Sequence, residues 1–381
     1  MGWVALGCGV LAMVTGLLPW HAGLAVAQRV WPVLLFLAAI KIVADLCDDA
    51  GLFDVAAHLA ARVARGRRMV LFLMFVALAT VCTWVLSLDT TAVLLTPIGL
   101  AVAAELGISP LPFAFASIWL ANAASLLLPV SNLTNLLAQD RLGLATVDFM
   151  ALTWRPQLAI LVVVTGVLVL RYRRPLSGRY VVPLQLPARD PVPLGVAAAV
   201  ALLTGPAIIA GAPAWSVASV GAAALVAVFA WRDASRVTPV RLWQLTPVSM
   251  IAFASGLFLV VEAVVRHAHT LLTQVLGTAD DGVVSLLRLA GVSAVAANVV
   301  NNLPAYLGIE PFAADPRRLV AVLIAVNAGP MIITWGSLAN LLWGQICADR
   351  GVVVSARRFA AEGLLVVPLA LLVGVLALAW P

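Results

Sequence analysis

The sequence is poor in charged residues. Only 10% of its 381 residues are Asp, Glu, Lys or Arg, whereas 63% are hydrophobic. A soluble domain carries about 25% charged residues, so this composition excludes an ordinary soluble globular protein. The mean hydropathy is +1.08, and the chain contains successive apolar runs of roughly 17 to 21 residues, long enough to cross a bilayer. We therefore predict an all-α polytopic membrane protein.

The sequence also lacks the clusters that mark metal and catalytic sites. Its four cysteines (Cys8, Cys47, Cys82 and Cys347) are far apart and form no CxxC pair, which argues against a thiolate metal site. The four histidines have no partner at metal-ligand spacing. We predict no metal, no cofactor and no enzymatic activity.

Two partner classes are also disfavoured. No phosphate-binding glycine loop is present, so any drive by ATP would need a separate ATPase subunit. The net charge of +6 does not indicate nucleic acid, because the arginines flank apolar runs, where they orient a membrane chain.

Two stretches about 205 residues apart resemble each other. Residues 121–135 read ANAASLLLPVSNLTN and residues 326–340 read VNAGPMIITWGSLAN, so that Asn122 aligns with Asn327. Each stretch places Pro, Gly, Ser or Asn inside an otherwise apolar run. Hydrocarbon offers no partner to a freed backbone group, so such breaks survive only when buried in protein or lining a cavity. Matching breaks in two halves predict the binding site of a secondary transporter.

Two further apolar regions are split by polar residues. Residues 69–106 are interrupted at Ser87–Thr91, and residues 283–309 are interrupted at Asn298 and at Asn301-Asn302. Each region predicts a re-entrant hairpin with a polar tip at membrane depth.

Charged, amphipathic segments precede both hairpins, at Leu52–Arg68 and Arg266–Asp281, and predict helices in the interface plane. We expect the first membrane span at Val4–Trp20. With the N-terminus in the cytoplasm, most arginines fall on the cytoplasmic side, as the positive-inside rule requires. This threading inserts the two hairpins from opposite sides.

The sequence thus predicts two inverted-topology repeats, each with a re-entrant hairpin and a broken transmembrane helix. The predicted parts are a first repeat at 1–171 with its hairpin at 69–106 and broken helix at 111–140, a linker and connecting span at 172–210, and a second repeat at 211–381 with its hairpin at 283–309 and broken helix at 319–347.

Three ionisable residues are candidates for coupling. Asp89 lies at the first hairpin tip, where burying a carboxylate at the bilayer centre costs about 2.5 to 3.5 kcal/mol. We interpret it as a proton- or sodium-linked acid beside the substrate; a helix N-cap is the alternative. Lys41 is the only lysine, and Asp45 follows one turn later. This pair is either a coupling amine with its counter-ion or a buried ion pair joining scaffold helices.

The candidate binding residues are amides, hydroxyls, one glycine and one acid, with no arginine. Such groups suit a neutral hydroxylated solute or a cation held by oxygen atoms. The predicted substrate-binding residues are Asp89, Thr90, Thr91, Asn122, Ser131, Asn132, Thr134, Asn135, Asn301, Asn302, Asn327, Gly336, Ser337 and Asn340.

Four segments carry a family resemblance: LDTTAVLLTP, LLLPVSNLTNLL, NVVNNLP and GPMIITWGSLANLLW. They resemble signature segments of the arsenite efflux pumps, the arsenical pump membrane proteins of the ion transporter superfamily. The resemblance implies a scaffold and a mobile transport part, with both tips and both broken-helix loops around one site. It also implies a bacterial plasma (inner) membrane location, arsenite and antimonite as substrates, proton or sodium as coupling ion, and a homodimer.

Three functions follow from this resemblance. Arsenous acid is mostly an uncharged trihydroxide near neutral pH, so proton-coupled arsenite export is our first hypothesis. The second is a sodium/proton antiporter in which Asp89, Ser131 and loop carbonyls hold sodium. A dicarboxylate-type small-anion carrier is third, since such carriers typically show Ser-Asn-Thr at both tips and this chain does not.

Overall fold

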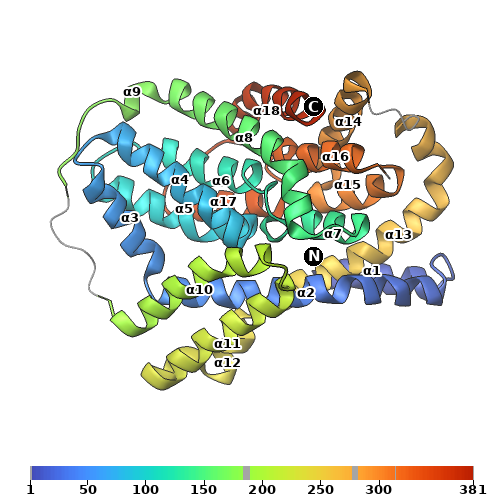
Figure 1. The fold of residues 1–381 in the computed structure, drawn as a ribbon, viewed down its shortest axis with the longest axis horizontal. Coiled ribbons are helices and arrows are strands. Elements are labelled where there is room, and N and C mark those ends of the chain that lie inside the picture. Colours follow the sequence, from blue (N-terminus) through green and yellow to red (C-terminus); the bar gives the residue numbers. More distant parts are fainter. Residues whose placement is uncertain (1, 183–188, 277–281, 314, 381) are drawn as a thin grey trace.

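The computed structural model describes residues 2–182, 189–276, 282–313 and 315–380. Within these ranges every regular element is a helix, and nine helices are long and apolar enough to cross a membrane. The protein is therefore an all-helical, multi-pass membrane protein. Figure 1 shows the helices, with α6, α16 and α17 near the middle of the bundle.

The helices of the N-terminal part are α1 (Gly2–Val14), α2 (Trp20–Asp49), α3 (Leu52–Val63), α4 (Arg68–Leu86), α5 (Leu88–Glu105), α6 (Leu111–Ala123), η1 (Pro129–Ser131), α7 (Leu133–Leu142), α8 (Thr146–Arg171), α9 (Arg173–Leu176) and α10 (Pro191–Ile209). Those of the C-terminal part are α11 (Ala214–Arg232), η2 (Ala234–Val237), α12 (Pro239–Leu245), α13 (Val248–Leu276), α14 (Val283–Val300), α15 (Asn302–Ile309), η3 (Glu310–Phe312), α16 (Pro316–Ala328), η4 (Gly329–Met331), α17 (Leu338–Asp349) and α18 (Ala356–Ala379).

The expected first span, Val4–Trp20, is wrong in its extent. Helix α1 ends at Val14, Gly16 takes a left-handed conformation with φ 79°, and Pro19 precedes the first residue of α2. Glycine tolerates positive φ, and proline suits the start of a helix, so the chain reverses here. At 13 residues α1 is shorter than the roughly 20 residues that span a bilayer.

The expected separate interfacial helix at Arg266–Asp281 is also wrong over the residues that the structure describes. Helix α13 runs without interruption from Val248 to Leu276, and residues 277–281 lie outside the described ranges. No glycine or proline falls between Arg266 and Leu276, so nothing local ends the helix at the membrane surface. In the first half the equivalent helix is separate, because α2 stops before Gly51, whose φ is 80°.

The centre of the bundle consists of α6 and α16. Every residue of α6 from Pro112 to Ala123 is buried, as is every residue of α16 from Arg318 to Ala328. A helix that is apolar on all sides belongs in the interior of a large protein. Both helices have 13 residues, and both α16 and α17 begin 205 residues after their counterparts α6 and α7. The ends of these central helices therefore place the aligned sequence breaks deep inside the molecule.

Helices α1 and α13 lie side by side in unusually close contact (Figure 1). A Cβ atom at Gly256 of α13 would lie 2.1 Å from the carbonyl carbon of Ala5, and one at Gly9 would lie 2.8 Å from the Cβ of Leu259. Small residues allow helix backbones to approach in this way inside a membrane.

Replacing Gly256 with valine should destabilise the protein by about 1 to 3 kcal/mol, because the obstructing atoms are backbone and cannot rotate away. Thermal unfolding of the purified protein in detergent would measure the loss. Gly7→Val is the matched control, since a Cβ at Gly7 of α1 meets nothing within 4 Å. Equal unfolding midpoints for the two variants would contradict the close contact.

Candidate functional site

The two hairpin tips share one backbone conformation. Between α4 and α5, Ser87 has φ 90° and ψ 162°; between α14 and α15, Asn301 has φ 85° and ψ 155°. A positive φ is uncommon for residues other than glycine, and such strained positions concentrate at functional sites. At both tips the helix stops for a single residue and the next helix packs back on the first.

The two broken helices are also held open in the same way. After α6, the Nδ2 of Asn135 donates to the carbonyls of Ser125 (2.6 Å) and Leu128 (3.1 Å). After α16, the Nδ2 of Asn340 donates to the carbonyls of Pro330 (2.7 Å) and Ile333 (3.0 Å). These four carbonyls occupy equivalent positions in the aligned stretches. One asparagine in the first turn of the following helix, α7 or α17, therefore replaces helical donors that the break removed.

Each loop is bound to the opposite half of the chain. Asn122, at the end of α6, donates from Nδ2 to Oδ1 of Asn340 at 3.0 Å. Asn327, at the end of α16, donates from Nδ2 to Oδ1 of Asn135 at 3.0 Å. All four amides are at most 2% exposed. The two central helices and the two loops therefore form one reciprocal amide network.

This network is asymmetric in one respect. The Oδ1 of Asn327 accepts from Nδ2 of Asn132 (2.6 Å) and from the Thr134 hydroxyl (3.3 Å). The Oδ1 of Asn122 is buried and receives no hydrogen bond within the described chain. The sequence explains the difference: Ser337 stands where the first half has Asn132, and an alanine stands where it has Thr134.

The hairpin tips contact the loops directly. The Ser131 hydroxyl donates to the carbonyl of Trp84 near the first tip at 3.3 Å. At the second tip, the Asn301 side chain donates to the carbonyl of Trp335 at 3.0 Å, and the Asn302 backbone N–H donates to that of Gly336 at 2.9 Å.

A cavity of about 40 Å³ lies where the tips and loops meet. Helices α2 and α13 complete its wall with apolar side chains. Its lining consists of Leu37, Leu88, Asp89, Asn132, Leu133, Met250, Phe253, Ala254, Asn301, Asn302, Leu303 and Leu338.

Asp89 brings a free carboxylate to this cavity. It lies in the first turn of α5, and the N-cap is Ser87, so the alternative interpretation of Asp89 as a helix cap is wrong. No hydrogen bond or ion pair joins its side chain to any residue that the structure describes. A helix N-terminus is electrostatically favourable for an anion.

Of the predicted binding residues, Asp89, Asn132, Asn301 and Asn302 line the cavity, and the others are not part of its lining. Thr91 accepts from the Thr83 hydroxyl at 3.1 Å and donates to the Ser87 carbonyl at 3.0 Å, while Thr90 accepts from Ser87 at 3.3 Å. The predicted residues that support the loops instead are Asn122, Ser131, Thr134, Asn135, Asn327, Gly336, Ser337 and Asn340.

Lys41 and Asp45 form an ion pair within α2 and do not line the cavity. Leu37, one turn before Lys41, does. Both interpretations of this pair remain predictions.

The apolar wall was missed by sequence analysis. Leu37 of α2 and Met250, Phe253 and Ala254 of α13 resemble any other membrane-span residues, and only packing brings them to the site.

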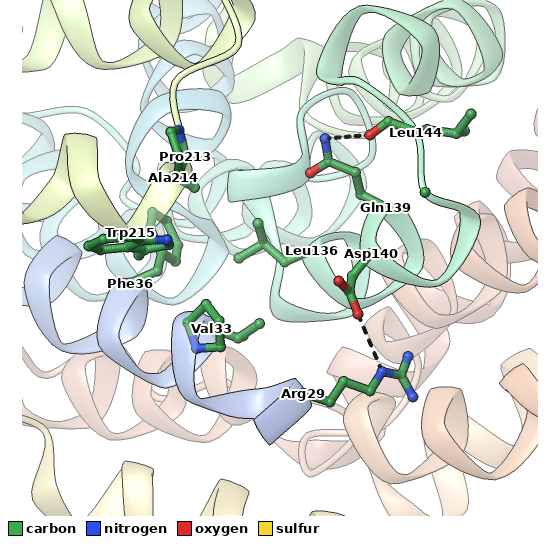
Figure 2. A pocket seen from close by; sticks show the side chains of 12 residues that line it. Arg29, Val33, Phe36, Leu136, Gln139, Asp140, Leu144, Pro213, Ala214 and Trp215 are labelled. Atoms are coloured by element: carbon green, nitrogen blue, oxygen red, sulfur yellow. Dashed lines mark hydrogen bonds and ion pairs between the residues drawn. The ribbon is translucent and has the colours of Figure 1, made fainter. Parts of the chain in front are cut away.

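Figure 2 shows a larger pocket, of about 360 Å³. Figure 2 shows Arg29 and Phe36 of α2 on one wall, Leu136 and Asp140 of α7 on another, and Trp215 of α11 beside Phe36. Phe36 precedes the cavity residue Leu37 on α2, and Leu136 follows the cavity residue Leu133 by three residues on α7, so the pocket lies next to the cavity; we call it the vestibule.

A cavity that holds a carboxylate and three amides and is enclosed by interrupted helices, in a bundle of membrane-length helices, is the architecture of a membrane transporter. The comparisons agree. The citrate transporter family matches residues 1–317 of the sequence, so the chain belongs to this family.

Within this family the chain resembles arsenical pumps. It is 30% identical to an arsenical pump membrane protein of Yersinia enterocolitica and 29% identical to that of Escherichia coli K12, covering 100% of this chain and 93% of each relative. The resemblance inferred from the four segments is thereby confirmed.

A solved structure shares the fold. The YdaH transporter of Alcanivorax borkumensis, described as having an unusual topology, superposes with a TM-score of 0.58 and 15% sequence identity. The match covers 98% of this chain and 89% of that one.

The asymmetric amide network predicts unequal effects of two alanine substitutions. Asn327→Ala leaves three buried partners unpaired, on Asn132, Thr134 and Asn135, and should destabilise by about 3 kcal/mol or more. Asn122→Ala leaves mainly Oδ1 of Asn340 unpaired and should cost about 1 to 2 kcal/mol. Thermal unfolding in detergent would compare them, and an equal or reversed order would contradict the network.

Proposed function

We propose that the protein exports arsenite and antimonite across the bacterial plasma membrane in exchange for protons. The observation that carries this proposal is the carboxylate of Asp89, which has no partner among the described residues, in a small cavity that also holds three amides. Carboxylates at membrane depth commonly serve as proton relays in transporters.

The cavity chemistry suits a small neutral solute. Besides Asp89, the Oδ1 of Asn301 and the Nδ2 of Asn302 have no partner among the described residues, so the lining offers both acceptors and a donor. No arginine or lysine belongs to the lining. About 40 Å³ admits a solute of a few heavy atoms and leaves little room for a di- or tricarboxylate.

Exchange for one proton supplies enough energy to export a neutral solute against a concentration gradient. The membrane potential contributes about 2.3 kcal/mol per 100 mV per charge, which corresponds to a roughly forty-fold gradient of a neutral solute. The full-length similarity to arsenical pumps supports the same substrate class.

A sodium/proton antiporter is the second candidate, because the Asp89 carboxylate could bind sodium or a proton in such a protein as well. One observation weighs against the predicted sodium site. The hydroxyl of Ser131 donates to a backbone carbonyl and lies outside the cavity lining.

The matched tips, loops and amide bonds support two inverted repeats of one architecture. Charge placement supports the orientation: Arg189, Arg236 and Arg350 gather around one pocket with Asp48, Asp49 and Asp54, at the end of α2 opposite Arg29. We place this end in the cytoplasm and Arg29 outside. The cytoplasmic N-terminus, the homodimer and an ATPase partner remain predictions.

Everted vesicles from a bacterial strain that lacks its own arsenite pump test the proposal. We expect arsenite to accumulate when a proton gradient is imposed and to stop accumulating when the gradient is collapsed. Sodium-induced proton release without arsenite uptake would replace the proposal with the antiporter.

Asp89→Asn should abolish proton-driven uptake in these vesicles, because the amide cannot carry a proton, while the protein stays folded. Asp148→Asn, in the exposed first turn of α8, is the matched control and should transport normally. Normal transport by Asp89→Asn would remove this residue from the mechanism.

Lys41→Met separates the two interpretations of the α2 ion pair. Unchanged transport with altered thermal stability would indicate a scaffold pair. Loss of proton dependence with normal stability would indicate coupling.

A further inference from the structure

Four charged side chains meet at one end of the elements that form the cavity. Glu310, at the start of η3, is only 3% exposed and accepts a hydrogen bond from Arg29 of α2. Asp140 of α7 lies 3.5 Å from the Nε of Arg29, and the Nε of Arg141 lies 4.0 Å from Glu310. Figure 2 shows Asp140 pointing toward Arg29, with a dashed line that marks their ion pair. We call these four residues the outer charge cluster.

Three of the segments that line the cavity meet again at this cluster. Helix α2 leads from Leu37 back to Arg29, and α7 leads from Leu133 to Asp140. Helix α15 leads from Leu303 to Glu310. Each path covers seven or eight residues, which at 1.5 Å per residue is about 10 to 12 Å. The cluster therefore ties together three elements at a similar distance from the cavity.

Side chains fill the space around this cluster incompletely. The vestibule of about 360 Å³ lies on one side of Arg29, and a second pocket of about 110 Å³, lined by Arg29, Arg141 and Glu310, lies on the other. Packing alone does not close this end, and the ion pairs supply contacts between α2 and the elements that carry the hairpin tip and loop.

We propose that the outer charge cluster is a gate, and that solute leaves the cavity toward the outside only after Arg29 separates from Glu310. The gate requires a membrane transporter, which the family membership establishes. Its outward side rests on the orientation given under the proposed function.

Two other ion pairs differ from this cluster because each lies within a single helix, so they serve as controls. Lys41–Asp45 and Glu262–Arg266 each join residues four apart on one helix. Breaking such a pair releases no element from another. Glu262 also lines the 110 Å³ pocket, so it is a matched control for Glu310.

Thiol labelling tests the gate without measuring transport. Leu37→Cys places a thiol in the cavity wall, in a Cys8→Ser background, because Cys8 is the exposed native cysteine and Cys47, Cys82 and Cys347 are buried. A membrane-impermeant maleimide added outside intact cells should react slowly with this protein. Adding Glu310→Gln or Arg29→Gln should raise the rate about tenfold or more, because losing one partner of a buried ion pair releases the contact.

Glu262→Gln should leave the labelling rate unchanged. Equal rates in the Glu310, Arg29 and Glu262 variants would overturn the gate. This readout is independent of substrate identity, so it stands even if arsenite is not transported.

A second measurement covers the case in which Glu310→Gln fails to fold. Arg29→Cys with Glu310→Cys, bridged by a bifunctional methanethiosulfonate, should stop transport in vesicles, and a reductant should restore it. The bridged pair Glu262→Cys with Arg266→Cys should keep transporting. Continued transport with the Arg29–Glu310 bridge in place would also overturn the gate.

Discussion

Hydrocarbon cannot hydrogen-bond a peptide group, and the rest of this structure depends on how the chain meets that constraint at four interruptions. Asn135 and Asn340 each bind two freed carbonyls of their own loop. Gln157 of α8 adds to the first loop by donating to the Ala123 carbonyl at 3.0 Å and accepting from the Leu126 N–H at 2.9 Å. The breaks are therefore fixed parts of the core, because their polar groups are paired inside it.

This pairing also determines what is left for a solute. Most side-chain amides of the broken helices already hydrogen-bond within the protein; in Asn327, for example, both Oδ1 and Nδ2 are bonded. These amides could bind substrate only if those hydrogen bonds were broken. Within the described ranges, the polar groups at the cavity that remain without a partner are the carboxylate of Asp89, the Oδ1 of Asn301 and the Nδ2 of Asn302. A rigid, satisfied network around a few unsatisfied groups is a suitable environment for selective binding of a small molecule.

Helix α2 connects the site to both sides of the protein. Its middle contributes Leu37 to the cavity, Arg29 in the outer charge cluster lies eight residues before Leu37, and its last residue, Asp49, lies 3.5 Å from Arg241 of α12. Charged residues of α2 thus lie on both sides of the apolar cavity wall.

The sequence by itself determined the class of protein, the positions of the interruptions and the residue types around them. The reason is that the membrane penalises polar groups strongly, so Asp89 and the loop asparagines stand out against an apolar background. The apolar runs alone did not show where α1 ends or that α13 continues past Arg266; the deciding local features are Gly16 and Pro19 after α1 and the lack of any glycine or proline between Arg266 and Leu276. Only the tertiary structure separated the residues that line the cavity from those that support the loops, and only it revealed Glu310 among the arginines. Those distinctions depend on which side chains meet across the two halves, and residues far apart in sequence carry no mark of that contact.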